Sequence, residues 1–184
     1  MSLNKILYNY MVNSLISKEY TVTLPDTKIL DDFVRGVITK KKEEKHHMND
    51  PYNEAKRWRT GMGGELALEI FINKKFADLS IGDSNDYHVP DLSALGLSVG
   101  IKTVELGKYP IVFKRSEKPE IIILKLEDAK YCILGLATTD VLNQYQDDSV
   151  ILSPSLKARR TKTGFIGLHS VKRFKSYEEL VKLL

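Results

Sequence analysis

The sequence predicts a single α/β domain of the α+β kind, with a central mixed β-sheet flanked by helices and a helical N-terminal extension. Two continuous apolar runs, EIIILKL (120–126) and KYCILGLA (130–137), are typical of strands that are buried on both faces. Segments with apolar residues at helical spacing lie on either side of these runs. The chain has 184 residues, 42% of them hydrophobic and 28% charged, which suits one domain with its own core.

Residues 1–50 are expected to form the helical extension. Residues 3–16 carry apolar side chains at helical spacing, and residues 21–24 are expected to be a short extended piece closed by a proline. Asp26 or Thr27 is expected to cap a second helix, whose apolar stripe consists of Leu30, Phe33, Val34, Val37 and Ile38. The charged run KKKEEKHHMND that follows is typical of a solvated helix end or a loop.

The core, residues 51–148, is expected to begin with a helical segment at residues 53–59. A glycine-rich stretch then predicts a tight turn, or the close approach of another backbone, at Gly61, Gly63 and Gly64. The next helix begins after these glycines and has the sequence ELALEIFINKKF. Farther along, residues 87–92 are expected to be short and extended, and residues 98–106 alternate well enough for a strand.

The two apolar runs are separated by the polar turn EDAK, so we expect an antiparallel hairpin in the interior of the sheet. Cys132 lies in the second run and is the only cysteine, which excludes an intramolecular disulfide and a cysteine zinc site. Its apolar neighbours predict a buried core position. Residues 138–145 can form a helix that covers the sheet, and residues 149–153 are expected to form a further short strand.

The C-terminal segment, residues 149–184, is basic. No acidic residue occurs from Ser149 through Tyr177, and LKARRTKTGF is expected to be a flexible loop carrying Lys157, Arg159, Arg160 and Lys162. Lysine and arginine neutralise phosphates, and arginine can bind one through two hydrogen bonds, although a charge run is also typical of a merely solvated face. The last residues, SYEELVKLL, predict a helix capped by its serine.

The overall charge of +4 is compatible with a polyanionic partner. The N-terminal residues lack the uninterrupted apolar region of a signal peptide, and nowhere are 18 consecutive residues apolar. We therefore expect a soluble, cytoplasmic protein without a membrane partner.

Three residues between Gly61 and Leu106 have the chemistry that metal-dependent cleavage of a phosphodiester requires. Glu65 lies on a predicted helix, Asp91 follows a proline just ahead of a turn, and Lys102 lies inside an apolar strand. Mg²⁺ or Mn²⁺ prefers hard oxygen ligands and is usually held by one or two carboxylates plus the phosphate oxygens of the substrate. A lysine beside the metal can orient the attacking water and offset the charge that develops on the phosphorane.

On these residues the chain resembles the PD-(D/E)xK nuclease superfamily, to which many restriction enzymes, junction resolvases and phage exonucleases belong. The matching positions are Pro90-Asp91 and Gly100-Ile101-Lys102, together with Glu65 at a glycine-rich helix entry, and the resemblance covers about residues 55–140. It implies a restriction endonuclease-like core and a deoxyribonuclease that hydrolyses DNA phosphodiester bonds. Members often dimerise to cut both strands, so the resemblance leaves a homodimer open.

The chain departs from this superfamily at Gly100, which stands where the second strand acid is expected. Glu65, Asp91, waters and the backbone carbonyl of Ile101 could still hold the metal. Alternatively Glu105 could substitute, although strand alternation points it away from the face of Lys102. In the third interpretation metal binding is lost and the domain only binds nucleic acid.

Other residues have weaker claims. Glu69 could face the metal instead of Glu65, or both could be surface carboxylates paired with lysines. His88 could contact the scissile phosphate or carry a proton, or it could be structural. The resemblance places Arg57 and Arg59 near the DNA backbone, whereas the alternative is a solvated flank beside a core tryptophan.

Lys102 also has a structural alternative, which is an edge strand with its ammonium in water. Two functional alternatives remain open as well. One is a catalytically degenerate module that binds DNA or RNA without cutting it, and the other is a protein-interaction module whose basic tail meets an acidic partner.

Overall fold

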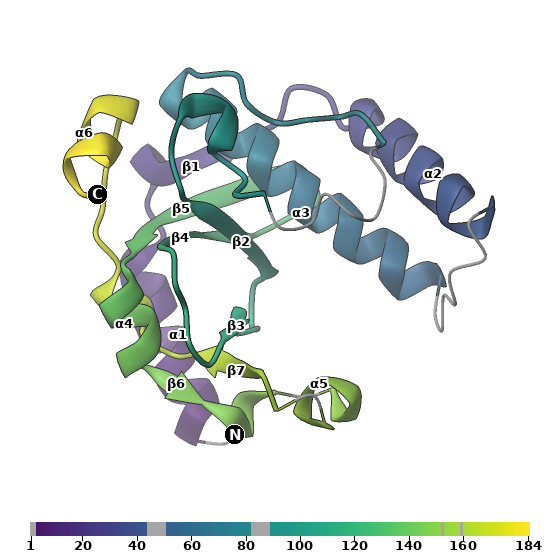
Figure 1. The fold of residues 1–184 in the computed structure, drawn as a ribbon. Helices are drawn as coiled ribbons and strands as arrows, with labels where there is room; N and C mark the ends of the chain where they lie inside the picture. The colour runs from purple at the N-terminus through teal and green to yellow at the C-terminus, as the bar shows by residue number, and fades with distance from the viewer. Residues whose placement is uncertain (1–2, 44–50, 82–88, 152, 159) are drawn as a thin grey trace.

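The computed structural model describes residues 3–43, 51–81, 89–151, 153–158 and 160–184. Within these ranges the strands form a four-stranded sheet, in the order β1-β5-β4-β2, and a three-stranded sheet, in the order β3-β7-β6. Helices flank the sheets (Figure 1). The predicted α/β fold of the α+β kind, with a mixed sheet and flanking helices, is thereby confirmed. No helix of the described residues is long and apolar enough to cross a membrane.

The larger sheet consists of β1 (Thr21–Thr23), β2 (Gly100–Glu105), β4 (Glu120–Lys125) and β5 (Lys130–Ala137). β4 and β5 form the predicted antiparallel hairpin in the sheet interior, and β2 lies parallel to β4 at one edge. The register of β4 and β5 shifts at Leu134, next to Gly135, whose φ of 140° and close approach to the Lys172 carbonyl both favour glycine.

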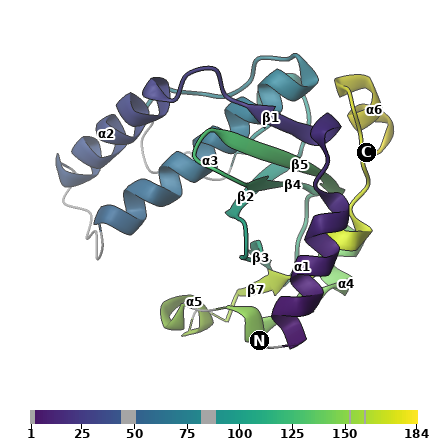
Figure 2. The same ribbon diagram turned by 180° about the vertical axis from the view of Figure 1, so that it is seen from behind.

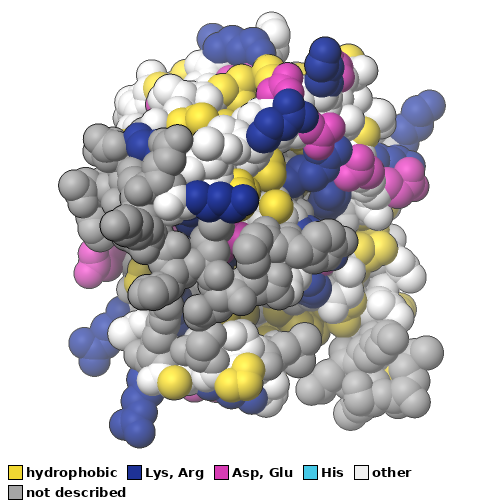
Figure 3. Space-filling model, turned by 90° about the vertical axis from the view of Figure 1, so that its right-hand side faces the viewer, with side chains coloured by type: hydrophobic (Ala, Val, Ile, Leu, Met, Phe, Trp, Pro, Cys, Tyr) yellow, Lys and Arg dark blue, Asp and Glu magenta, His cyan; other side chains and the backbone are white. Residues whose placement is uncertain are grey.

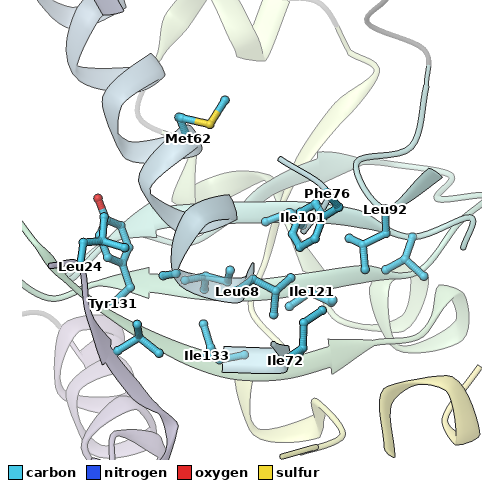
Figure 4. Packing of buried hydrophobic residues seen from close by; sticks show 14 of the residues in the cluster. Leu24, Met62, Leu68, Ile72, Phe76, Leu92, Ile101, Ile121, Tyr131 and Ile133 are labelled. Atoms are coloured by element: carbon cyan, nitrogen blue, oxygen red, sulfur yellow. The ribbon is translucent and has the colours of Figure 1, made fainter. Parts of the chain in front are cut away.

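The central strands are buried on both faces, as their apolar runs predict. Ile121 and Ile123 of β4 pack in the core under α3 (Pro51–Ile72), together with Leu68 and Ile133 (Figure 4). The alternate residues of β4 and β5 face a second core on the other side of the sheet, which contains Ile122, Leu124, Cys132 and Leu134. Cys132 is fully buried, as predicted.

The helix α3 crosses one face of the large sheet, and α2 (Lys28–Glu43) runs beside it (Figure 1). The prediction of two helices separated by a glycine turn is wrong, because α3 continues through Gly61, Gly63 and Gly64. A Cβ atom at Gly63 would overlap the Tyr131 hydroxyl, and one at Gly64 would overlap the Thr103 side chain. Glycine therefore serves here for close packing of the helix on the sheet.

On the opposite face lies α1 (Leu3–Leu15), which buries Tyr8 and Val12 (Figure 2). The predicted N-terminal helix, the strand that corresponds to β1 and the second helix are confirmed. Asp26 accepts a hydrogen bond from the Lys28 amide at the start of α2, as expected of a capping residue.

The smaller sheet contains β3 (Ile111–Phe113), β6 (Gln146–Asp147) and β7 (Lys162–Phe165). The helix predicted after the hairpin is confirmed as α4 (Thr139–Gln144). The predicted strand at residues 149–153 is wrong, because a 3₁₀ helix, η4 (Asp148–Val150), lies there. The expected basic loop is wrong in part, since it contains α5 (Pro154–Ala158) and β7.

Two further short elements complete the C-terminal segment, η5 (Leu168–Ser170) and α6 (Tyr177–Lys182). Ser176 caps α6 by accepting a hydrogen bond from the Glu179 amide, as predicted. The Glu179 carboxylate in turn accepts a hydrogen bond from the Lys175 amide, so side chains bond to two backbone amides at the start of α6.

Candidate active site

Asp91 is placed by a turn at the free edge of β2. Residues 89–92 form a bend and a turn, followed by the 3₁₀ helix η3 (Ser93–Leu95), so the expected extended piece is wrong where it is described. The Leu92 amide donates to the Val99 carbonyl (3.1 Å), which closes this loop. The Asp91 carboxylate accepts a hydrogen bond of 2.5 Å from the Ile101 amide and is thereby fixed beside the strand.

The Ile101 carbonyl points toward the same edge. The N–H and C=O groups of one strand residue project to the same side of the strand, and the Ile101 N–H points to Asp91. The neighbouring Gly100 amide points the other way, to the Pro119 carbonyl before β4. The backbone oxygen that the sequence suggests as a metal ligand therefore lies on the edge where Asp91 lies.

The residues of β2 divide between the two faces of the sheet. Ile101 packs in the core under α3 and the Thr103 side chain lies against Gly64 of that helix, whereas Val104 packs toward the second core. Because side chains alternate along a strand, Lys102 projects away from α3, on the side of the smaller sheet. β2 is an edge strand and the Lys102 side chain is 32% exposed, as in the structural alternative for this residue.

Glu120, which sequence reasoning missed, lies directly beside Gly100. The two residues are partners in the parallel register of β2 and β4. A Cβ atom at Gly100 would collide with the Glu120 carboxyl group, whose Cδ atom would lie 2.8 Å away. A carboxylate thus occupies the space in front of position 100, although it comes from the neighbouring strand.

The Glu120 carboxyl is buried, and its residue is only 5% exposed. Its Oε1 atom lies 3.9 Å from the Lys102 ammonium, and its Oε2 atom has no hydrogen-bond partner within the described residues. Burial raises its pKa, Asp91 adds to this, and Lys102, Lys118 and Lys162 oppose it. A buried acid with an unused oxygen can accept a cation or a donor.

Glu65 lies on α3, on the other face of β2. Its pKa is raised to about 8, first by burial and then by the carboxylates of Asp91, Glu69 and Asp78. Apart from burial, all three groups that raise the pKa of Glu65 are carboxylates. The Asp91 carboxylate raises the pKa of both Glu65 and Glu120. It therefore interacts electrostatically with an acid on each face of β2.

Glu69 and Glu105 are occupied elsewhere. Glu69 is buried and accepts hydrogen bonds from the Phe76 and Ala77 amides (2.6 and 2.8 Å) and from Lys75 (2.9 Å). Burial raises its pKa, but these hydrogen bonds outweigh that effect and lower it. Glu105 forms ion pairs with Lys56 and Lys108 at 2.7 and 2.6 Å, on the strand face opposite Lys102.

The candidate acids surround the edge of β2 without forming a compact cluster. In the ranges that the structure describes, no group of three or more His, Cys, Asp or Glu side chains is arranged to hold a metal ion. The donor types are nevertheless hard carboxylate and carbonyl oxygens, which Mg²⁺ and Mn²⁺ prefer. His88 and Arg159 lie outside the described residues.

The predicted nucleic-acid contacts differ in their surroundings. Arg59 is only 18% exposed and forms ion pairs with Asp31 and Asp128, which tie α3 to α2 and to the turn after β4. Arg57 is exposed and pairs with Glu54. Two acids therefore already neutralise the Arg59 guanidinium, and its contact with the DNA backbone stays a prediction.

Among the described residues of the basic tail, Lys162 is the one whose charge acts on the site. Lys162 of β7 influences the Glu120 pKa and lies over the Phe113 ring, with 3.0 Å between its Nζ atom and the ring centroid. Lys157 and Arg160 are exposed. On the face shown in Figure 3, lysine and arginine side chains are spread over the surface with acids among them.

Comparison of the chain with protein-family models, with curated proteins and with solved structures finds no match.

Proposed function

We propose that the protein is a metal-dependent deoxyribonuclease of the PD-(D/E)xK kind that hydrolyses DNA phosphodiester bonds at the edge of β2. The observation that supports this most is the Glu120 carboxyl group in front of Gly100. An acid thereby accompanies Asp91 and Lys102 where the sequence motif alone has a glycine. In this proposal the second acid comes from Glu120 of β4, whereas the superfamily pattern has it on β2, at the position of Gly100.

Asp91, Glu120 and the Ile101 carbonyl would hold Mg²⁺ or Mn²⁺, with Glu65 on the other side of the strand. The unused Oε2 atom of Glu120 fits this role, because a bound cation would give this buried oxygen a partner. When bound, the metal ion supplies an activated water and stabilises charge on the phosphate.

The residues of the chain have separate tasks in this mechanism. Lys102 orients the attacking water and places its ammonium where negative charge develops. Glu120 lies 3.9 Å from that ammonium, on the same face of the sheet, and pairs with it electrostatically. Asp91 is fixed by the Ile101 amide, so its free oxygen keeps one position at the strand edge.

A second candidate function is binding of nucleic acid without cleavage. Its support is the pKa of Glu65 near 8, since a carboxyl that is protonated at neutral pH is a poor metal ligand. The lack of a compact ligand cluster among the described residues supports the same alternative.

Cleavage assays separate the two candidates. Linear, supercoiled and single-stranded DNA would be incubated with the protein in Mg²⁺, Mn²⁺ or EDTA. We expect cleavage that requires metal and that is lost in Asp91→Ala and Lys102→Ala but kept in the surface controls Glu127→Ala and Lys108→Ala. Circular dichroism would verify that all variants fold. DNA binding without cleavage under every condition would favour the non-catalytic function.

A further inference from the structure

Phe113 of the smaller sheet is one of the exposed large apolar side chains of the described residues. It is 50% exposed, at the end of β3, and its register partner on β7 is Lys162. The ammonium of Lys162 covers the ring and also influences the Glu120 carboxyl. Phe113 is therefore linked to the site through a single lysine.

The backbone around Phe113 is held firmly. Its carbonyl accepts hydrogen bonds from the Gln146 amide group (3.3 Å) and the Ser116 hydroxyl (3.2 Å). Asn143 of α4 bonds to both the amide and the carbonyl of Ser116 (2.8 and 3.1 Å). An exposed ring on an anchored backbone loses little conformational entropy when a ligand packs on it.

Cations lie on this ring and beside it in the chain. Lys162 covers the ring, and the next two residues after Phe113 are Lys114 and Arg115, both exposed. Lys114 also pairs with Asp148 at 2.5 Å. An aromatic side chain beside several cations is the arrangement that binds a single strand of nucleic acid, in which phosphates meet the cations and bases stack on the ring. Paired bases in a duplex have no free face to offer.

We propose that Phe113 stacks on an unpaired base next to the scissile phosphate, so that the protein prefers DNA with a single-stranded or frayed segment at the site. This inference rests on the proposed nuclease function. The phosphate draws Lys162 off the ring and the base takes its place. Such an exchange is favourable, because stacking of a base on an aromatic ring is stronger than an exposed cation–π contact.

Binding of 2-aminopurine DNA tests the proposal without cleavage. The background is Asp91→Asn in EDTA, and the probes are one labelled oligonucleotide, single-stranded or in a duplex. Phe113→Leu is expected to weaken single-strand binding about tenfold and duplex binding less than about twofold. Phe113→Trp should retain binding and quench the fluorophore. The control Leu106→Ala removes an apolar group of the same 50% exposure from the loop after β2 and should change neither affinity.

The proposal is overturned if Phe113→Leu leaves single-strand affinity unchanged, or weakens both forms of DNA equally. A protein that cleaves DNA but shows this result keeps its proposed function and loses only the stacking role. If the unsubstituted chain binds neither probe, the proposed function fails and the stacking role fails with it.

Discussion

Burial and three neighbouring carboxylates raise the pKa of Glu65 from 4.5 to about 8. Between these values the folded protein binds a proton that the unfolded chain releases, so the free energy of unfolding falls as pH rises from about 4.5 to about 8. This part of the stability is fully present below pH 4.5 and is lost above pH 8. Glu65→Gln removes it, and denaturant titrations at several pH values should show a weaker pH dependence in the variant. Parallel curves for the two proteins would contradict this account of Glu65.

Glu69 differs from Glu65 although the two lie one helical turn apart. Its carboxylate satisfies the Phe76 and Ala77 amides in a buried position. Glu69→Ala leaves these donors without a partner, and we expect the free energy of unfolding to fall by about 2 kcal/mol. The cleavage rate per folded molecule should change little, because Glu69 lies outside the proposed ligand set. A large loss of rate in a fully folded variant would instead place Glu69 in the chemistry.

The site residues differ in how far the sequence reveals them. Asp91 and Lys102 stand out because a proline-acid turn and a lysine in an apolar strand are local patterns. Glu120 is hidden at the start of an apolar run, and its role depends on the register that pairs it with Gly100. The residues around Glu120 do not predict this register, because it is set by the packing of two strands that are joined by a long connection.

At the scale of elements, substitutions of the glycines in α3 test whether glycine is needed there for close packing or only adds flexibility. The Cβ atom of Gly64→Ala would overlap Thr103, whereas that of Gly61→Ala would have no neighbour within 4 Å. We expect Gly64→Ala to lower the free energy of unfolding by about 1–3 kcal/mol, because a packed interface resists added volume. Gly61→Ala should raise it by about 0.5–1 kcal/mol, since alanine is the better helix former. Thermal unfolding measures both, and equal shifts would contradict close packing at Gly64.

The same glycines explain one wrong prediction from the sequence. Each glycine costs a helix interior about 1 kcal/mol relative to alanine, so three within four positions favour a turn. In the fold this cost is offset by the contact of Gly63 and Gly64 with the sheet, which sequence propensity does not include. The smaller sheet was missed for a related reason. The strand β7 is short and begins with a lysine, and its burial depends on β3 and β6 on either side.

At the scale of the whole molecule, the net charge of +4 says little about which basic residues meet a polyanion. Lys162 lies near the site, whereas Arg59 is neutralised by Asp31 and Asp128. Lys162→Ala is expected to weaken DNA binding and to reduce the slope of log affinity against log salt by about 1. Arg59→Ala should leave the slope unchanged and lower the melting temperature instead. Fluorescence anisotropy at several salt concentrations measures the slopes, and a reversed result would assign the phosphate contact to Arg59 instead of Lys162.

The central claim is that Glu120 replaces the acid that is missing at position 100, and moving the acid between the strands tests it most directly. The measurement is the rate of Mg²⁺-dependent DNA cleavage by Glu120→Ala and by the double variant Gly100→Glu/Glu120→Ala. Loss of one charged group at a transition state typically lowers the rate about 100-fold or more, and we expect this for Glu120→Ala. The double variant should recover at least part of the rate. Cleavage by Glu120→Ala at the rate of the unsubstituted protein would contradict the claim.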